Sequence, residues 1–459
     1  MNKKIALAHI ADSRDDLYKI RESLVLKELQ NIQWIKDEFK VIESKVLRSD
    51  RQIKEFITEI KKDDVSALIL HIPIWADPIF SVKLAKMCER PILLVGNTHL
   101  DTSSLVGMLG AGGALDQIGI YHLRIFEAVS QENKKKISAF LNSANTIRQL
   151  HGKTLGLFGG KSLGIFTAVA DPAQWQTLFG VDIEYIDQCE IVNEAKSISD
   201  KKMKNHYNWL IEHVGKVEFG GKFTKTRLTM QIKSYLATKK LINKYGLDFV
   251  GVKCQTELSD GYVSQCVAHM LLNGELDAEG PKTSIVHACE SDADGALTME
   301  ILHLLSGEKP TALLDIRWFD QKKKQWTFTN CGAMPADFYS CKSEEDGLSK
   351  VHVRPHVFGE GGGCALTAFV SPRIVTLARL CRISGDYQMF VVKGEVIESD
   401  PETLKNTTAA FPQAIIKANA GYDFLQKFGS NHIHMVSGDY IKSLTYFCDL
   451  LSLPCQVWE

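Results

Sequence analysis

The first third of the chain alternates continuous apolar segments with amphipathic ones, and this alternation restricts it to few fold classes. Apolar runs occupy residues 4–10 (KIALAHI), 65–75 (VSALILHIPIW) and 90–97 (RPILLVGN), and residues 18–39 have the spacing of one amphipathic helix. Strands that are apolar throughout are buried on both faces, as in a parallel sheet covered by helices. The sequence therefore predicts a doubly wound α/β domain over residues 1–152.

The same alternation of apolar and helix-like segments continues through the second third of the chain, and a different pattern follows it. Residues 153–309 contain apolar runs (LGLFGG, FVGV, IVHAC) separated by helix-like segments, which predicts a second doubly wound domain. Residues 310–459 instead carry short alternating strands between turn residues, which is typical of an antiparallel sheet or barrel, before a closing helix. We therefore expect an α/β protein with two doubly wound parallel-sheet lobes and a β-rich antiparallel C-terminal domain.

The balance of charge argues against several partner classes. The chain has 54 basic and 55 acidic residues and a formal net charge of −1, with triple-lysine runs only at 134–136 and 322–324. Nucleic-acid binding needs clustered basic residues, so we expect no nucleic-acid partner. No apolar run reaches a membrane span, and residues 4–10 are too short for a secretory signal. With eleven scattered cysteines and no CxxC pair, the sequence predicts a cytoplasmic protein with free thiols and no membrane partner.

The segment GLFGGKS at residues 156–162 resembles a phosphate-binding loop but does not match its pattern. That pattern needs a glycine five residues before the Gly-Lys-Ser glycine, and this position is Leu155. We interpret Gly159 and Gly160 as a tight strand-to-helix turn. Such a turn still offers backbone amides to a ligand.

Within the segment IVHACESDADGALTMEIL, three acids, Glu290, Asp292 and Asp294, fall within five residues. An apolar strand is predicted before them, and a helical pattern follows that ends at Gly307. An aspartate at the start of a helix is commonly its N-cap, and we assign that role to Asp292 or Asp294. This leaves Glu290 unexplained at the carboxyl end of the strand.

A second acid repeats this arrangement, because Asp315 ends the apolar run PTALL. Two carboxylates at the carboxyl ends of two strands can face one another at the sheet edge where ligands bind. A buried pair of acids repels itself unless a cation neutralises it. By spacing alone, a divalent-metal pair and two unrelated loop acids are equally compatible with Glu290 and Asp315.

His432 and His434 lie in the segment GSNHIHMVS near the C-terminus. Alternate spacing on a strand directs both side chains to one face, so this segment is a candidate source of a metal ligand. Two carboxylates and one imidazole would form a mixed oxygen and nitrogen set, which suits Mn²⁺ or Mg²⁺ better than a metal that prefers thiolates. The nearby cysteines are expected to be small core side chains.

Four segments, in order along the chain, resemble L-fucose isomerase and, more distantly, L-arabinose isomerase. They are GGKSLGIFTAVADPAQWQTLFGVDIEYIDQCEI, ACESDADGALTMEILHLLSGEKPTALLDIRWFD, IVTLARLCRISGDYQMFVVKGEV and SNHIHMVSGDYIKSLTYFCDLLSLP. The resemblance implies that Glu290, Asp315 and His432 are metal ligands, since the Asn-His pair favours His432 over His434. It also implies that Glu290 and Asp315 are the catalytic acid/base pair, and that the metal is Mn²⁺, with Mg²⁺ or Co²⁺ as alternatives.

The same resemblance implies further substrate-binding residues. Arg14 corresponds to a substrate-contacting arginine, Trp75 to an aromatic wall of the sugar site, and Asn431 to an edge of the pocket. Arg354 and His356 fall near the expected pocket mouth, where they are either solvated strand residues or an anion site for a sugar charged at C6. The family also implies a homo-oligomer, a hexamer or trimer, with active sites shared between subunits.

The expected activity is aldose–ketose isomerisation of a small-molecule sugar, a hexose or deoxyhexose, through an enediolate. A sugar charged at C6, such as a 6-sulfonated hexose, is the alternative substrate. One rival class is a non-catalytic two-lobed sugar-binding protein, which the carboxylate pair and the missing export signal disfavour. Another is a different metal-dependent sugar enzyme, such as an aldolase or an epimerase.

Overall fold

The computed structural model describes residues 3–399 and 411–459, which form two compact units. One unit runs to Gln149 and includes Lys442–Ser452, and the other comprises the described parts of Leu150–Ile441 and Leu453–Glu459. Each unit has its own buried apolar core. Each can therefore be described as a separate body.

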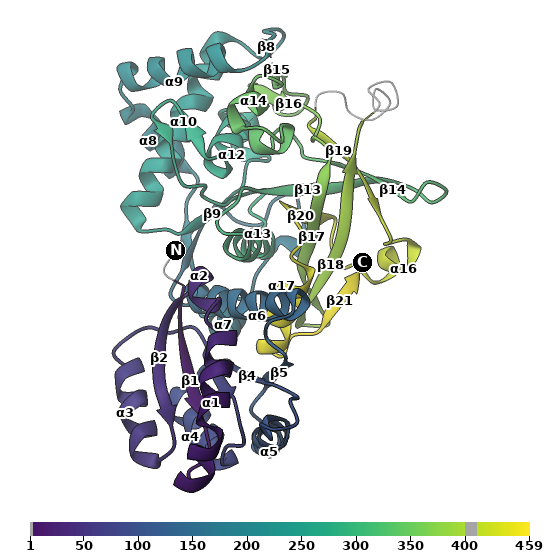
Figure 1. Cartoon of the computed structure of the whole chain (residues 1–459). Coiled ribbons are helices and arrows are strands. Elements are labelled where there is room, and N and C mark those ends of the chain that lie inside the picture. Colours follow the sequence, from purple (N-terminus) through teal and green to yellow (C-terminus); the bar gives the residue numbers. More distant parts are fainter. Residues whose placement is uncertain (1–2, 400–410) are drawn as a thin grey trace. The chain divides into compact units, whose positions relative to one another are not determined.

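The first unit is a five-stranded parallel sheet with the order β2-β1-β3-β4-β5, covered by helices (Figure 1). The central strands are almost wholly buried, which explains why their sequences are apolar throughout. Because β2 and β3 flank β1 on opposite sides, the carboxyl edge between β1 and β3 is a topological switch point. The strands are β1 (Lys4–Ile10), β2 (Lys40–Leu47), β3 (Leu68–Ile72), β4 (Ile92–Gly96) and β5 (His122–Phe126).

The helices of this unit follow the sequence pattern with one difference. Residues 18–39, predicted as one helix, form α1 (Asp15–Asn31) and the single turn α2 (Ile35–Glu38). The break lets both Ile32 and Ile35 become buried. The other helices are α3 (Asp50–Ile60), α4 (Pro78–Cys88), α5 (Ser104–Gln117), α6 (Gln131–Leu150) and α17 (Ile441–Leu450).

The second unit combines a smaller parallel sheet with a barrel. The parallel sheet has the order β12-β9-β6-β7, so its switch point lies between β6 and β9. Its strands are β6 (Thr154–Phe158), β7 (Asp182–Ile186), β9 (Phe249–Val252) and β12 (His287–Cys289). Its helical segments are η1 (Phe166–Ala168), α7 (Pro172–Phe179), α8 (Cys189–Ser197), α9 (Asp200–His213), α10 (Lys225–Tyr245), α11 (Glu257–Gly261), α12 (Cys266–Asn273) and α13 (Ala293–Leu305).

Six antiparallel strands close into the barrel, because β17 pairs with both β20 and β18 and so completes the ring β17-β20-β13-β14-β19-β18. A seventh strand, β21, adds to β18 in parallel. The strands are β13 (Thr311–Asp320), β14 (Gln325–Thr329), β17 (Arg373–Ile383), β18 (Asp386–Ile397), β19 (Gln413–Ala418), β20 (His432–Ser437) and β21 (Cys455–Trp458). The predicted fold class, two parallel-sheet lobes and a β-rich C-terminal part, is confirmed.

Smaller elements surround this frame. Strands β15 (His352–Pro355) and β16 (Cys364–Thr367) do not join the barrel, although their sequence resembles that of barrel strands: β15 pairs with β16 on one side and with β8 (Lys216–Val217) on the other. The remaining segments are the hairpin β10 (Leu276–Asp277) and β11 (Gly280–Pro281), with η2 (Ala336–Tyr339), α14 (Glu344–Leu348) and α16 (Tyr422–Lys427). The three domain ranges proposed from sequence stay a prediction.

Helix α13 is the structural centre of the second unit. All of its residues are buried, because it packs against β6, β9 and β12 of the parallel sheet and against β13, β17 and β20 of the barrel (Figure 1). A helix that is buried on every side is expected only in such a position. Its N-terminus therefore lies where the carboxyl end of β12 meets the barrel.

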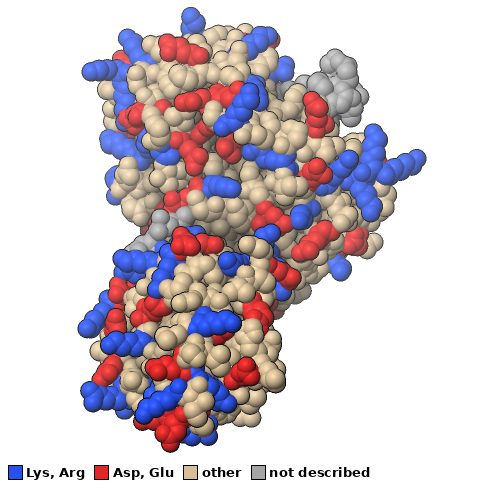
Figure 2. Space-filling view, in the orientation of Figure 1, with Lys and Arg blue, Asp and Glu red and all other residues tan. Residues whose placement is uncertain are grey.

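The distribution of surface charge and the character of the helices are relevant to the expected absence of nucleic-acid and membrane partners. Basic and acidic side chains are interspersed over the face of each unit drawn in Figure 2. Within the described residues, no helix combines the length and the apolar character that crossing a bilayer requires. The expected absence of nucleic-acid and membrane partners stays a prediction.

Candidate active site

The structure brings Glu290, Asp315 and His432 together within the second unit. The His432 Nε2 atom lies 3.3 Å from Glu290 Oε2 and 3.5 Å from Asp315 Oδ1. Nε2 is buried and has no hydrogen-bond partner among the described residues. Three residues far apart in the sequence thus converge on one unsatisfied imidazole nitrogen.

The barrel places two of these side chains by strand pairing. Asp315 on β13 lies directly opposite His432, the first residue of β20, in an antiparallel ladder. Neighbours in such a pair have Cβ atoms about 5 Å apart, so the carboxylate and the imidazole are held on one side of the barrel. His434, two residues along β20, is fully buried, and neither of its ring nitrogens has a hydrogen-bond partner in the described part of the chain. Of the two candidate histidines, only His432 meets the carboxylates.

The third side chain comes from the turn between β12 and α13. Glu290 and Ser291 have φ values of +58° and +52°, in the left-handed region that residues with side chains seldom adopt. Two such residues in succession are costly, and outliers of this kind are concentrated at functional sites. The turn aims the Glu290 carboxylate at His432 before the chain enters α13.

The turn ends at Asp292, which has two roles. Its Oδ1 accepts the backbone N–H of Gly295 at 2.8 Å, so it is the N-cap that the sequence left open between Asp292 and Asp294. Its Oδ2 lies 2.7 Å from Nδ1 of His432. A carboxylate on the outer nitrogen of a metal-binding histidine fixes the ring orientation and the tautomer. With Nδ1 so engaged, Nε2 is the nitrogen left to face Glu290 and Asp315.

A buried arginine completes this arrangement. Arg379 on β17 donates from Nη1 to Asp292 Oδ2 at 2.5 Å and from Nη2 to Asp292 Oδ1 at 3.0 Å, and both side chains are at most 1% exposed. Burial works to raise the pKa of Asp292, but Arg379 and His432 outweigh it and lower that pKa well below its usual value. Arg379 also donates from Nη2 to the carbonyl of Thr167 at 2.6 Å, which ties the loop after β6 to the site.

These residues fit a divalent metal ion. If Nδ1 of His432 carries the proton that it donates to Asp292, the lone pair of Nε2 faces two carboxylate oxygens, and this is repulsive unless a second proton on Nε2 or a metal cation lies between them. Adjacent ligands on one octahedral cation, at about 2.1 Å each, are about 3 Å apart, close to the 3.3 and 3.5 Å separations at His432, although in the described residues the ligand atoms of all three side chains do not lie within 4.8 Å of one another. Two carboxylates and an imidazole suit Mn²⁺, Mg²⁺ or Co²⁺. Glu290, Asp315 and His432 are the residues that would hold the metal.

Three further predicted residues lie in the same unit. Asn431 precedes His432, and its Oδ1 accepts the Thr167 hydroxyl at 3.4 Å. His356 hydrogen-bonds the Cys331 thiol, and Cys331 Sγ lies 3.7 Å from Sγ of Cys289, the residue before Glu290. The side chain of Arg354, on β15, is only partly exposed. The substrate-binding roles of these residues stay predictions.

Arg14 and Trp75 belong to the first unit. Arg14 follows β1 and Trp75 follows β3, so both lie at the switch point of the five-stranded sheet, where ligands bind in folds of this kind. Arg14 is 61% exposed and is held by Asp12, which is fully buried, through Nε–Oδ1 and Nη2–Oδ2 bonds of 2.8 and 2.9 Å. Two parallel bonds to a buried carboxylate orient the guanidinium while one of its edges faces outward.

A second group of possible metal ligands is already neutralised. His206, Asp277 and Glu279 offer ligand atoms that all lie within 4.8 Å of one another. The ammonium of Lys239 lies 2.8 Å from oxygens of both Asp277 and Glu279, and Lys202 lies 2.9 Å from the other oxygen of Glu279. These lysines supply the positive charge that a metal would bring, so we interpret this group as an ion-pair network.

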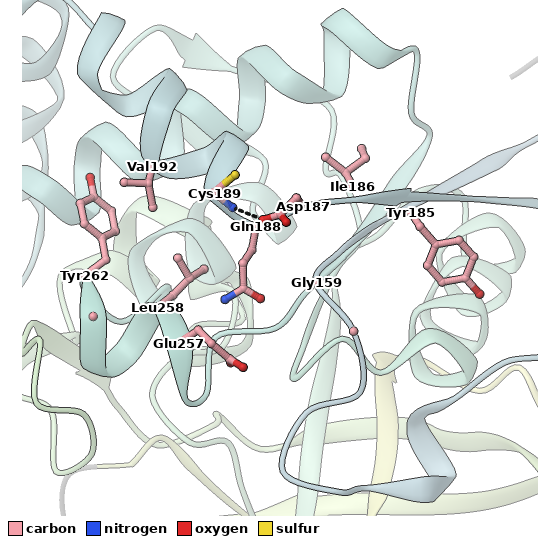
Figure 3. A pocket seen from close by; sticks show the side chains of 12 residues that line it. Gly159, Tyr185, Ile186, Asp187, Gln188, Cys189, Val192, Glu257, Leu258 and Tyr262 are labelled. Atoms are coloured by element: carbon pink, nitrogen blue, oxygen red, sulfur yellow. Dashed lines mark hydrogen bonds between the residues drawn. The ribbon is translucent and has the colours of Figure 1, made fainter.

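A cavity of about 700 Å³ opens at the carboxyl edge of the second sheet (Figure 3). Its walls are the turn at Gly159 and Gly160, the end of β7 with the start of α8, and helix α11. The N–H of Cys189 at the start of α8 is taken by Asp187 Oδ1 at 2.9 Å, and Glu257 adds a second acid. The residues that line the cavity include no lysine or arginine, so the cavity favours a neutral or cationic ligand over an anion.

Asp294 belongs to a neighbouring network that ties α13 to α7 and the barrel. Its Oδ1 accepts the Tyr387 hydroxyl at 2.7 Å and Trp175 Nε1–H at 3.3 Å. Burial raises the pKa of Asp294 to about 6, although Arg379, Tyr387 and Arg382 oppose the shift. Between the ordinary pKa of an aspartate, 3.8, and this raised pKa, the folded protein therefore holds a proton that the unfolded chain has released.

This proton gives a prediction for Asp294→Asn. The pKa of this carboxyl is higher in the folded protein than in the unfolded chain. Below its pKa in the unfolded chain, the carboxyl has no effect on stability. As the pH rises from there through its pKa in the folded protein, the carboxyl progressively destabilises the fold. The variant lacks this ionisation, so its stability relative to the parent protein should increase between about pH 4 and about pH 6.5, by up to about 3 kcal/mol. Denaturant unfolding of both proteins across this range measures the difference, and parallel pH profiles would contradict it.

Comparison with known proteins agrees with this geometry. Residues 328–459 match the family model for the L-fucose isomerase C-terminal domain. The sulfoquinovose isomerase of Priestia aryabhattai is 20% identical over 444 residues, which cover 94% of each chain. The L-fucose isomerase of Bacteroides fragilis (strain YCH46) is 25% identical over 233 residues, 44% of this chain and 39% of that protein. The comparisons support a fucose isomerase-like family for the chain. The sulfoquinovose isomerase of Clostridium sp. (strain MSTE9), 22% identical over 81% of this chain and 79% of its own length, is another similar protein.

The resemblance read from four sequence segments is thereby confirmed, and the relatives carry the names of sugar isomerases. The matched C-terminal region contains His432 and Asn431, whereas Glu290 and Asp315 precede it. The structure adds what the matched region lacks, since β13 and the turn after β12 bring both acids to His432.

Sequence reasoning missed Arg379 as part of this site. A single arginine in the apolar run IVTLARLC is a weak signal, although an arginine buried in a strand needs an anionic partner. Asp292 was recognised only as a possible cap. Its contact with His432 depends on residues 140 positions apart, which no local pattern reveals.

Proposed function

We propose that this chain is a metal-dependent aldose–ketose isomerase of a hexose, with Mn²⁺ as the metal and Mg²⁺ or Co²⁺ as alternatives. The observation that carries the proposal is the convergence of the Glu290 and Asp315 carboxylates on the buried, unpartnered Nε2 atom of His432. The names of the relatives support isomerase activity for the whole chain. A sugar-binding protein without catalysis would not require two acids at such a position.

The proposed chemistry moves a proton between adjacent carbons. When bound, the metal supplies the positive charge that stabilises an enediolate on the two substrate oxygens. One of the Glu290 and Asp315 carboxylates removes the proton from carbon, and the other exchanges the proton on oxygen. Each such step typically contributes about 10²–10⁴-fold to the rate. Asp292 and Arg379 keep His432 in one tautomer and one orientation.

For the substrate, the comparisons favour a sulfonated hexose over a neutral deoxyhexose. The similarity to the Priestia aryabhattai sulfoquinovose isomerase spans 94% of the chain, whereas that to the Bacteroides L-fucose isomerase spans 44%. A sulfonate needs a basic partner in the site. Arg14, held outward at the switch point of its sheet, has the required charge, as has Arg354 on β15. We propose a cytoplasmic homo-oligomer, a trimer or hexamer, in which subunits share sites.

The test is an isomerase assay with purified protein after EDTA treatment, with and without added Mn²⁺. The substrates are sulfoquinovose, L-fucose, L-arabinose and glucose 6-phosphate, and products are followed by NMR in deuterated water. Isomerisation through an enediol should place solvent deuterium at C1 or C2 of the product and should depend on Mn²⁺. The absence of turnover on every sugar would favour the binding-protein alternative, and cleavage or epimerisation would favour the other enzyme class.

The protonation of His432 gives a prediction for metal binding. Burial alone would lower the pKa of His432, but the hydrogen bond to Asp292 and the Asp315 and Glu290 carboxylates raise it well above its usual value. A metal must replace this proton at Nε2, so the apparent affinity for Mn²⁺ should fall by up to about tenfold for each pH unit below that pKa. Titration calorimetry at several pH values measures the slope and the proton release. Affinity that is independent of pH would exclude His432 as a ligand.

A further inference from the structure

We propose that Cys289 and Cys331 are a redox modification site, where a hydroperoxide converts the two thiols to a disulfide and so displaces Glu290. The disulfide follows from the geometry of the thiols alone. Its effect on turnover rests on the proposed isomerase function, because that function gives Glu290 its role.

The two thiols are in contact. Cys289 is the last residue of β12, Cys331 follows β14, and their Sγ atoms lie 3.7 Å apart. A disulfide has an S–S distance of about 2.05 Å, so the sulfurs must approach by about 1.6 Å. Cys331 is partly exposed, whereas Cys289 is 8% exposed. An oxidant therefore reaches Cys331 first, and Cys289 is positioned to react with the oxidised sulfur.

The segment that carries Cys331 holds its sulfur in place. The Asn330 side chain accepts the backbone N–H groups of Gly332 and Ala333 at 3.1 and 3.0 Å and donates to the carbonyl of Leu313 at 3.1 Å. A side chain on Gly332 would collide with Cys266 and His356, so this loop is closely packed. Because the loop that carries Cys331 is held in this way, shortening the distance between the two Sγ atoms has to move Cys289.

That movement reaches the proposed metal site directly. Cys289 immediately precedes Glu290, and its carbonyl accepts the N–H of Asp292 at 3.1 Å. The next residue, Ser291, donates its N–H to Val252 at 3.1 Å, and Glu290 and Ser291 already have left-handed backbones. A turn in this constrained conformation has little freedom to absorb a shift of more than about 1 Å. The Glu290 carboxylate is therefore expected to move away from His432.

The reaction is balanced with the hydroperoxide as oxidant. The Cys331 thiolate attacks the outer oxygen of the peroxide, the O–O bond breaks, and the products are a sulfenic acid at Cys331 and an alcohol, or water in the case of hydrogen peroxide. The sulfur of Cys289 then attacks that of Cys331, loses its proton and expels hydroxide, which leaves as water. Two electrons pass from the thiols to the peroxide, and a thiol reductant reverses the change.

The Cys331 thiol should react slowly with peroxide. The hydrogen bond to Cys289 and burial raise the pKa of Cys331 well above its usual value, so little reactive thiolate is present at neutral pH. The pair is therefore suited to respond to sustained oxidant.

The test exposes the Mn²⁺-loaded protein to hydrogen peroxide and follows three quantities. Peptide mass spectrometry without reduction should show the segments of Cys289 and Cys331 joined, with the loss of two hydrogens. Mn²⁺ affinity should fall at least tenfold, and isomerase activity should fall by a similar factor. Dithiothreitol should restore both. Failure to detect the joined peptides after prolonged exposure would overturn the proposal.

Two variants separate this pair from general oxidation. Cys331→Ala and, independently, Cys289→Ser should both keep Mn²⁺ affinity and activity under peroxide. Cys341→Ala removes a more exposed thiol and should leave the parent protein's sensitivity unchanged. Loss of Mn²⁺ affinity in Cys331→Ala equal to that of the parent would refute the proposed link. A joined peptide and reduced Mn²⁺ affinity in a protein without isomerase activity would uphold the disulfide and reject the proposed function.

Discussion

Glu290→Gln is expected to lower kcat by about 10³-fold or more while the protein remains folded. The amide keeps the shape of the side chain but can neither accept a proton from carbon nor supply a negative charge to a cation. General acid/base catalysis contributes about 10²–10⁴-fold, and weakening of the proposed metal site would add to the loss. The Glu290 side chain is buried, at 11% exposed, and its Oε2 lies 3.3 Å from Nε2 of His432, so bulk water has little access to take over its role. Steady-state assays at saturating Mn²⁺ measure kcat, and circular dichroism checks the fold.

The matched control is Glu308→Gln at the other end of α13. Glu308 also has a left-handed backbone, with φ of +68°, but it lies beyond the last turn of the helix and away from the cluster. Its replacement should change kcat by less than about twofold, as for surface substitutions in general. Activity of Glu290→Gln within tenfold of the parent protein would remove Glu290 from the proposed mechanism.

The sequence predicted those features that depend on local patterns. Continuous apolar strands such as 65–75 led correctly to parallel sheets, because a strand buried on both faces has no polar positions. The change to alternating strands after residue 310 led correctly to an antiparallel C-terminal part. Glu290 and Asp315 were singled out because each ends an apolar strand, and carboxyl ends of strands form ligand-binding edges.

Long-range pairing was beyond such patterns. The closure of the barrel by β17 and β18, and the diversion of β15 and β16 to a separate sheet with β8, depend on contacts between distant residues. The position of His432 opposite Asp315 is a matter of strand register, which a shift of one residue would reverse. The set of candidate metal ligands, Glu290, Asp315 and His432, came from the family resemblance, because local sequence patterns do not reveal strand register.

Arg379→Met is expected to lower the free energy of unfolding by about 3–5 kcal/mol, the usual cost of leaving one charge of a buried pair without its partner. Asp292 is fully buried and Arg379 is 1% exposed, so water cannot replace the lost guanidinium. His432 and the N–H of Gly295 still contact Asp292 in the variant. Because these contacts remain, the loss of unfolding free energy should stay within this range. Denaturant unfolding measures the loss, and Mn²⁺ affinity should fall at the same time because Asp292 no longer holds His432 firmly.

Two comparisons decide whether burial causes this effect. Lys393→Met breaks an ion pair of similar length, 2.6 Å against 2.5 Å, but Lys393 and Asp439 are 42% and 45% exposed. Exposed pairs contribute about 0–1 kcal/mol, so this variant should remain nearly as stable as the parent protein. The double variant Arg379→Met with Asp292→Asn should regain part of the lost stability, because it removes the stranded charge, yet it should not regain Mn²⁺ affinity, because an amide orients His432 less well than a carboxylate. Equal losses of unfolding free energy in Arg379→Met and Lys393→Met would show that burial of the Arg379–Asp292 pair does not determine the cost of breaking it.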